Sequence, residues 1–119
     1  MIRRKEECNV EIKKAMRDGP GQVIQTTIAS KEEMLNNARM FSKLYFEPGC
    51  GIGMHEHNDE CEIFLVNKGE LTYYEDDNEY LIKEGDITIL ESGHRHSVIN
   101  KSNQPAELIA IILLDRDKK

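Results

Sequence analysis

The sequence has no tryptophan and only three cysteines, Cys8, Cys50 and Cys61, which form no Cys-x-x-Cys pair. A sparse, odd set of this kind argues against a disulfide framework and for reduced thiols. The longest apolar run, 108–114, is far shorter than the roughly 20 residues that cross a bilayer. The N-terminus carries charges where a secretory signal needs an apolar segment. We therefore expect a cytoplasmic protein with no membrane partner.

Positive charge is also in short supply, since the net charge is -6. A phosphate backbone calls for a basic face, so nucleic acid is not an expected partner. The length of 119 residues suits one domain. The strongest turn signal in the chain is the Asp-Gly-Pro-Gly cluster at 18–21. We expect it to separate an N-terminal arm, 1–21, from a main domain, 22–119.

Beyond the arm, the chain is a succession of short β-type segments separated by Gly, Asn and Asp. Such spacing, roughly 8 to 12 residues, predicts an all-β sandwich or small barrel. Ser30 and Glu33 form a capping-box pattern, which predicts one or two short helical turns. Helix-period segments are nearly absent afterwards, which argues against a parallel α/β sheet. The expected strands are 22–29, 38–47, 60–67, 70–75, 79–82, 86–90, 94–100 and 106–114.

All four histidines fall in two His-x-His pairs, His55 with His57 and His94 with His96. Side chains alternate between faces on a strand, so His55 and His57 point the same way from backbones about 7 Å apart. Taken alone, one such pair is most often two exposed surface histidines. A second pair in the same short chain favours a shared metal site.

Glu62 strengthens this hypothesis because it begins an apolar strand face that continues through Phe64 and Val66. A carboxylate in such a place is costly unless it is paired, and a cation is the usual partner. A barrel can bring the later strand alongside, which makes His96 a candidate third imidazole.

Three imidazoles and one carboxylate suit a divalent transition metal, and Mn, Fe, Co, Ni, Cu and Zn all stay open. Octahedral coordination would leave two positions for water or a ligand. The expected pocket walls are Phe64, Val66, Val98 and His94. His94 could be a proton donor beside the metal, but it follows a glycine, and a loop histidine is the preferred interpretation.

These residues resemble the two motifs of the cupins, specifically the small single-domain cupins. The second motif normally has proline where this chain has Glu91, which leaves the rigidity of the loop before His94 open. The first motif is matched by Gly49, His55, His57, Glu62 and Gly69, and the second by Gly85, Gly93, His96 and Asn100.

The resemblance implies a jelly-roll β-barrel, the double-stranded β-helix, with His55, His57, Glu62 and His96 as metal ligands. It also implies a homodimer in which segment 1–29 pairs with the partner's sheet. Cupin activities include dioxygenases, decarboxylases, isomerases and lyases, and fold alone cannot choose among them. In an enzyme, Glu62 could double as general base. The alternatives are a non-enzymatic module that binds or senses a small molecule and a degenerate cupin with an empty site.

Overall fold

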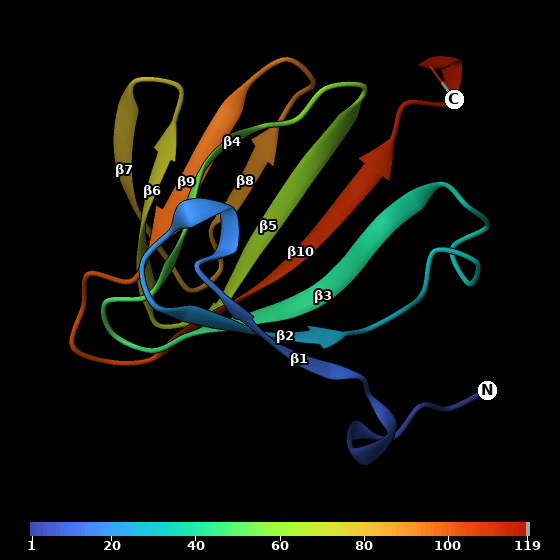
Figure 1. Ribbon diagram of the computed structural model, residues 1–119, viewed down its shortest axis with the longest axis horizontal. Helices are drawn as coiled ribbons and strands as arrows, with labels where there is room; N and C mark the ends of the chain where they lie inside the picture. The colour runs from blue at the N-terminus through green and yellow to red at the C-terminus, as the bar shows by residue number, and fades with distance from the viewer. Residues whose placement is uncertain (119) are drawn as a thin grey trace.

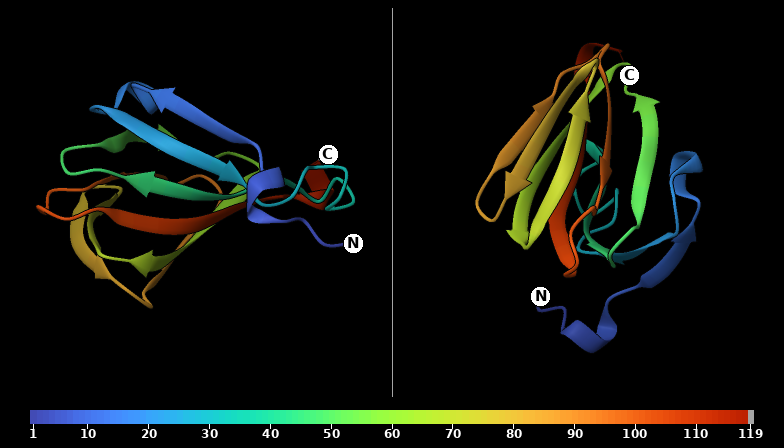
Figure 2. Two further views of the ribbon diagram at one scale, coloured as in Figure 1. Left: turned by 90° about the horizontal axis from the view of Figure 1, so that it is seen from below. Right: turned by 90° about the vertical axis from the view of Figure 1, so that its left-hand side faces the viewer.

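The computed structural model describes residues 1–118; Lys119, the last residue of the expected main domain, lies outside the described residues. Two antiparallel sheets face each other, as Figures 1 and 2 show. The six-stranded sheet has the order β1 (Val10–Lys14), β2 (Gln22–Thr27), β3 (Ala38–Phe46), β10 (Ala106–Leu114), β5 (Glu60–Lys68), β8 (Ile87–Leu90). The four-stranded sheet has the order β4 (Gly51–Glu56), β9 (Arg95–Ile99), β6 (Glu70–Glu75), β7 (Asn78–Lys83).

This arrangement confirms the all-β jelly-roll barrel. Strands that are distant in sequence are neighbours in the sheets. Strand β10 lies between β3 and β5, and strand β9 lies between β4 and β6. The expected strands 70–75 and 106–114 agree with the structure at both ends, and the others differ by one or two residues. Strand β4 was implied by the alternation of His55 and His57, but His57 lies just past its end.

The core follows from the two-residue period of the strands. On β5, Glu62, Phe64 and Val66 are buried between the sheets, whereas Leu65 is exposed on the outer face. Burying a Phe, Leu or Val side chain stabilises the fold by about 1.5–3 kcal/mol. The cluster of buried apolar residues comprises Val23, Leu44, Phe46, Ile52, Phe64, Val66, Leu71, Tyr73, Ile82, Val98, Ala106, Leu108 and Ala110.

Strand β1 of the N-terminal arm forms a β-hairpin with β2, and this hairpin extends the six-stranded sheet of its own chain. Strand β1 pairs with β2, and β2 pairs with β3. The turn between β1 and β2 contains the short 3-10 helix η2 (Met16–Asp18), which packs against β4. The loop drawn in blue in Figure 1 thus lies over the strand that leads into His55.

The helical content is confined to single turns. Ser30 and Glu33 form the expected reciprocal bonds, with Glu33 N donating to Ser30 Oγ at 3.1 Å and Ser30 N to Glu33 Oε1 at 2.8 Å. They begin a hydrogen-bonded turn rather than a helix. The other turns are η1 (Lys5–Glu7) and η3 (Arg116–Lys118). Within residues 1–118, no helix is both long and apolar enough to cross a membrane.

Buried Asn100, the last residue of the second motif, secures the loops at the far end of the barrel. Its Nδ2 donates to the carbonyl oxygens of Phe46, at 3.0 Å, and Gln104, at 2.7 Å. Its Oδ1 accepts from Ser102 N at 2.9 Å. This residue therefore supports the fold and does not line the site.

Candidate metal centre

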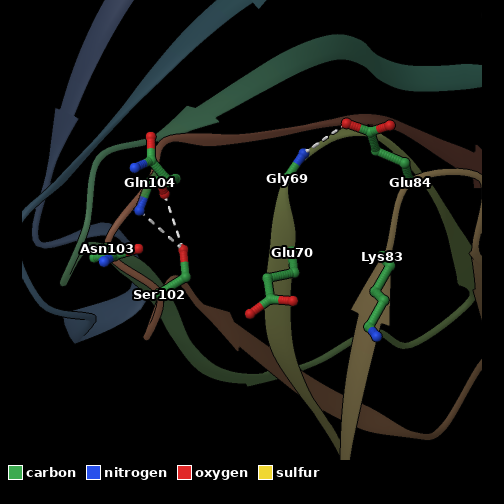
Figure 3. A pocket seen from close by; sticks show the side chains of 7 residues that line it. All are labelled: Gly69, Glu70, Lys83, Glu84, Ser102, Asn103 and Gln104. Atoms are coloured by element: carbon green, nitrogen blue, oxygen red, sulfur yellow. Dashed lines mark hydrogen bonds between the residues drawn. The ribbon is translucent and has the colours of Figure 1, made fainter.

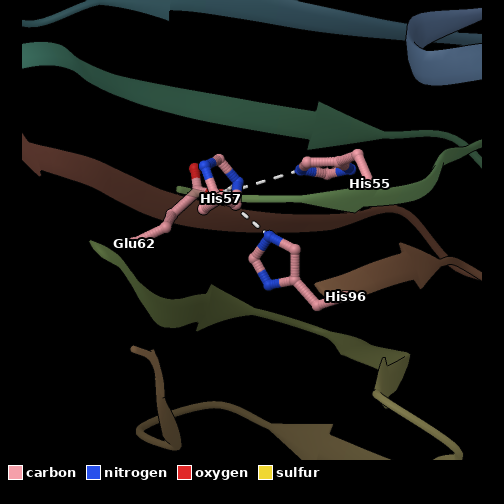
Figure 4. A group of neighbouring side chains, drawn as sticks. All are labelled: His55, His57, Glu62 and His96. Atoms are coloured by element: carbon pink, nitrogen blue, oxygen red, sulfur yellow. Dashed lines mark hydrogen bonds and ion pairs between the residues drawn. The ribbon is translucent and has the colours of Figure 1, made fainter. Parts of the chain in front are cut away.

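The four expected ligands converge from three strands at one end of the barrel (Figure 4). His55 lies on β4 directly opposite His96 on β9, and Glu62 lies near the start of β5. One ligand atom from each of His55, His57, Glu62 and His96 can be chosen so that all lie within 4.8 Å of one another. The barrel thus brings together residues as far apart in sequence as His55 and His96, which are 41 positions apart.

Backbone and carboxylate groups orient the first two imidazoles. His55 Nδ1 lies 2.7 Å from the carbonyl oxygen of Gly53, so it carries the proton and donates. His57 Nδ1 lies 2.5 Å from Glu60 Oε2, so this nitrogen is likewise protonated and donates a hydrogen bond to the carboxylate. Each ring therefore presents its unprotonated Nε2 to the centre, which is the usual arrangement for metal-bound histidines.

The Nδ1 atom of His96 also has a hydrogen-bond partner, the hydroxyl group of Tyr73. Tyr73 donates its hydroxyl proton to Glu75 Oε1 at 2.9 Å, which leaves its oxygen to accept from His96 Nδ1 at 3.2 Å. Phe64 stacks on the His96 ring, with centroids 5.0 Å apart and an interplanar angle of 16°. Ring position and tautomer of His96 are thus both set by neighbouring side chains.

Glu62 completes the cluster. Its Oε1 lies 2.9 Å from His96 Nε2, 3.0 Å from His57 Nε2 and 4.0 Å from His55 Nε2. His57 Nε2 is buried and makes no hydrogen bond. Nitrogen lone pairs and a carboxylate that face one another in a buried space repel unless a cation lies between them. The donor set therefore fits a divalent transition metal.

The protonation states also favour metal binding. Burial lowers the pKa of His55 to about 4, so its imidazole is neutral at pH 7. Burial alone would raise the pKa of Glu62, but the neighbouring His57 and His96 outweigh this effect and lower the pKa to about 2. Glu62 is therefore a carboxylate at neutral pH. Metal ligands must be deprotonated, and His55 and Glu62 are in that form. Burial alone would lower the pKa of His57, but Glu62 and Glu60 outweigh it and raise the pKa instead, so a metal at this position must displace a proton more readily held.

Arg39 fixes the carboxylate that orients His57. Its Nε and Nη2 donate to the two oxygens of Glu60 at 2.8 and 2.7 Å. Arg39 is the extra residue of a β-bulge, because Met40 pairs with Ile112 and Ala38 pairs with Leu113. A bulge re-aims side chains, and here it lets Arg39 line the pocket. Simple alternation along the strand could not have revealed this role.

A cavity of about 60 Å³ adjoins the cluster. Its walls are mostly apolar, and Arg17 and Arg39 are its charged residues apart from Glu62. Met16 and Arg17 come from the N-terminal arm, so sequence reasoning did not place them in the site. The lining residues are Met16, Arg17, Arg39, Met40, Leu44, Ile52, His55, His57, Glu62 and Ile112.

Comparison with known proteins identifies the family, because the cupin domain family matches residues 43–112. The chain is a cupin. A relative from Thermotoga maritima, named an oxalate-binding protein, is 36% identical over 114 residues, which cover 96% of this chain and 94% of the relative.

Solved structures agree with this assignment. The crystal structure of a predicted oxalate decarboxylase from Thermotoga maritima is 36% identical, with a TM-score of 0.92 over 96% of this chain and 99% of the other. A cupin superfamily protein from Desulfitobacterium hafniense is 19% identical, with a TM-score of 0.68 over 79% of each chain. The second likeness shows the fold alone.

The expected pocket walls are placed differently in this cupin. Phe64, Val66 and Val98 are almost fully buried in the core and do not line the cavity, although Phe64 contacts His96. His94 lies outside the cavity, with half of its side chain exposed, and its Nδ1 bonds to Asp76 Oδ2 at 2.8 Å. In the structure, His94 therefore belongs to a loop that lies outside this cavity.

The loop before His94 is ordered without the usual proline. Gly93 N donates to the carbonyl oxygen of His57 at 2.8 Å, and His94 N donates to that of Glu91 at 3.3 Å. Gly93 has φ of +92°, a conformation that glycine adopts without penalty. The turn therefore lies directly against the first histidine pair.

A larger hollow, about 390 Å³, lies at the opposite end of β5 from Glu62 (Figure 3). Apart from Gly69, the residues that line it are charged or carry a hydroxyl or amide group, and none is a histidine or cysteine. It lacks the convergent buried donors of the metal centre, so size alone does not make it the functional site. The residues around it are Gly69, Glu70, Lys83, Glu84, Ser102, Asn103 and Gln104.

Proposed function

We propose that this cupin holds a divalent transition metal at His55, His57, Glu62 and His96 and uses it to bind a small carboxylate such as oxalate. The observation that carries the proposal is the convergence of three imidazole Nε2 atoms and one carboxylate oxygen beside a small cavity. The name of the oxalate-binding relative supports the choice of ligand.

The metal would supply a Lewis-acid centre for a carboxylate oxygen of the ligand. The chain's own contribution is to fix the ligands, which Gly53, Glu60 and Tyr73 do through the Nδ1 atoms of the histidines. Mn, Fe, Co, Ni, Cu and Zn all suit this donor set, and supply and geometry select among them.

The cavity favours a small anion. Its volume of about 60 Å³ suits a ligand of few heavy atoms, and half of the residues that line it are apolar. Arg17 and Arg39 are present at its rim in a chain whose net charge is -6. Because Arg39 is paired with Glu60, the positive charge that would attract a carboxylate there comes from Arg17 and the bound metal.

The direct test combines metal analysis with calorimetry. Protein reloaded with each of the six metals is assayed for bound metal, and oxalate is then titrated into the metal-free and metal-loaded forms. We expect about one metal per chain and oxalate binding only in a loaded form. Failure of every metal to remain bound would refute the site, and equal oxalate binding without metal would refute its role.

Decarboxylation of the bound ligand is the second candidate, supported by the structural relative described as a predicted oxalate decarboxylase. In that case Glu62 is the proposed general base. Outside the cluster, however, Arg17 and Arg39 are the ionisable residues among the described cavity walls. Guanidinium groups do not release protons near neutral pH, so binding without turnover is the favoured function.

Turnover distinguishes these two functions. Metal-loaded protein is incubated with oxalate, and formate and carbon dioxide are measured over time. The binding function predicts none above the metal-only control. Product formation that is lost in Glu62→Gln, in protein that still contains metal, would instead establish the enzyme.

We also propose that two copies of this cupin associate through the outer face of the six-stranded sheet. Leu65 lies between Ile87 and Ile109, and Ile63 lies in the same way between Ile89 and Ile111, which makes two adjoining apolar rows. Ile87 and Ile89 are 61% and 58% exposed. Apolar patches of this kind mark protein interfaces. The exchange of segment 1–29 with a partner's sheet stays a prediction.

Light scattering after size exclusion tests the association. The unmodified protein is expected to be a dimer at micromolar concentration, and Ile87→Glu with Ile89→Glu is expected to give a monomer. Leu35→Glu, at an exposed position in the turn between β2 and β3, serves as control and should remain a dimer. A monomeric unmodified protein would refute the proposal.

A further inference from the structure

Arg17 stands apart from the other charged residues near the metal centre. It comes from the turn between β1 and β2, outside the segment that matches the cupin family, yet it lines the same cavity as His55, His57 and Glu62. Arg17 lies in the 3-10 helix η2, which packs against β4, and β4 contains His55 and ends just before His57. The arm thus contributes directly to a site whose ligands all come from the barrel.

Close backbone contact fixes the position of this turn. A Cβ atom on Gly53 would lie 1.9 Å from the carbonyl oxygen of Arg17, and one on Gly19 would lie 2.5 Å from Gly51 O. Arg17 itself has φ of +52°, a conformation that non-glycine residues adopt only where the surroundings impose it. Glycines on both sides therefore let the turn lie against β4 and present Arg17 at the cavity.

The two rim arginines differ in how their charges are balanced. Arg39 makes two charge-assisted bonds to Glu60, so its charge is already neutralised. For Arg17, no hydrogen bond or ion pair of the side chain occurs within the described part of the chain. Its guanidinium is therefore available to a ligand in the cavity.

The charges of the loaded site then indicate the charge of its ligand. A divalent ion brings two positive charges, Glu62 removes one and Arg17 restores one, while Arg39 and Glu60 cancel and the three imidazoles are neutral. Two positive charges remain next to a cavity of about 60 Å³. A small dianion would neutralise the site, whereas a monoanion would leave one charge unmatched.

We propose that Arg17 is the specificity-determining residue that makes this pocket prefer small dicarboxylates to monocarboxylates. This inference rests on the proposed function, in which one carboxylate of the ligand is directed at the cluster. The second carboxylate is then received by the guanidinium, whose planar fork matches a carboxylate with two parallel hydrogen bonds.

The test compares two ligands of similar size and different charge. Oxalate, a dianion, and glyoxylate, a monoanion, are titrated calorimetrically into metal-loaded protein. Arg17→Gln removes the charge and the fork, Arg17→Lys keeps the charge without the fork, and Lys14→Gln removes one exposed positive charge from the same arm outside the cavity. Metal content and thermal unfolding are measured for every variant.

We expect Arg17→Gln to weaken oxalate binding about 10- to 100-fold, the range of a lost charge-assisted pair. Glyoxylate binding should change by less than about threefold, so that the preference for oxalate falls. Arg17→Lys should lie between the unmodified protein and Arg17→Gln because it lacks the fork. Lys14→Gln should bind both ligands as the unmodified protein does.

Other results would overturn the inference in distinct ways. If loaded, unmodified protein binds neither ligand, the proposed function fails and the inference fails with it. If it binds oxalate but Arg17→Gln keeps the same preference, the inference fails while the proposed function stands. If Arg17→Gln loses metal, or weakens both ligands equally, Arg17 only supports the structure and does not select the ligand.

Discussion

The two His-x-His pairs share one sequence pattern but lie in different surroundings. His55 and His57 both enter the metal cluster, whereas only His96 of the second pair does. His94 is half exposed and bonds to Asp76 in the turn between β6 and β7. Spacing therefore identifies which residues could bind a metal, and the backbone at each position decides which of them meet in one cluster.

The difference comes from where each strand begins or ends. Strand β9 begins at Arg95, so His94 belongs to the preceding turn and strand alternation does not orient it. His57 also lies outside its strand, since β4 ends at Glu56. Its ring is nevertheless turned inward because Glu60, held by Arg39, binds its Nδ1. Each of these two rings is thus oriented by a carboxylate: Glu60 holds His57 toward the cluster, and Asp76 holds His94 away from it.

The largest expected effect is the loss of a ligand from each pair. His57→Ala and His96→Ala should abolish stoichiometric metal binding, whereas His94→Ala should retain it. At a metal concentration 1,000 times the Kd, bound metal stabilises the fold by about 4 kcal/mol, and the first two variants should lose that gain. Metal analysis and thermal unfolding with and without metal measure both effects. Equal metal loss in His94→Ala would show that the pairs are equivalent after all.

The next effect concerns the carboxylates that orient the two outlying rings. Glu60→Gln should lower metal affinity about 10- to 100-fold, as expected when a partner of a metal-bound histidine is removed. Asp76→Asn makes the same chemical change next to His94 and should leave metal affinity unchanged. Competition with a chelator of known affinity gives both values. If Glu60→Gln binds metal normally, the orienting role assigned to Glu60 is wrong.

The smallest effect appears in the proton uptake of the metal-free protein. Burial lowers the pKa of His55 to about 4, whereas the bond to Asp76 raises the pKa of His94 above its ordinary value. His94 should therefore be protonated before His55 as the pH falls. An NMR titration of the imidazole nitrogens separates the two. A His55 that titrates near the ordinary value of about 6.5 would show that its ring is solvated.

The shift of His55 also has a consequence for stability. In the unfolded chain this ring takes up its proton near the ordinary value, about 6.5, and in the folded chain only near 4. Between these values the unfolded state binds more protons, so the contribution of His55 to the free energy of unfolding falls as the pH falls. Bound metal should shift this loss to lower pH because it competes with the proton.

Much of the fold was accessible from sequence because turn chemistry and alternation are local. The glycine, asparagine and aspartate clusters separated eight of the ten strands to within two residues, and β6 and β10 were predicted with their observed ends, whereas β1 and β4 were not among the expected strands. The capping box at Ser30 was also correct in its bonds, although the following residues form a turn. Local rules fixed each bond there, but no packed apolar face extended the turn into a helix.

The candidate site was only partly accessible. The spacing of the histidines and the isolated Glu62 pointed to four residues that the structure brings together. Arg39 was missed because a bulge turns its side chain toward the pocket, and Arg17 because the arm had no visible connection to the barrel. His94 was included as a pocket wall because alternation was applied across a turn, where it does not hold.

The sequence by itself determined the inventory: the short strands, the turns between them and a donor set suited to a transition metal. The tertiary structure decided which donors meet, because contact between residues far apart in the chain depends on sheet pairing. It also decided the rim of the cavity, since Arg17 reaches the site only through the close approach of the arm to Gly53. Local residue patterns encode strands and turns, whereas the assembly of a site requires the packing of the whole chain.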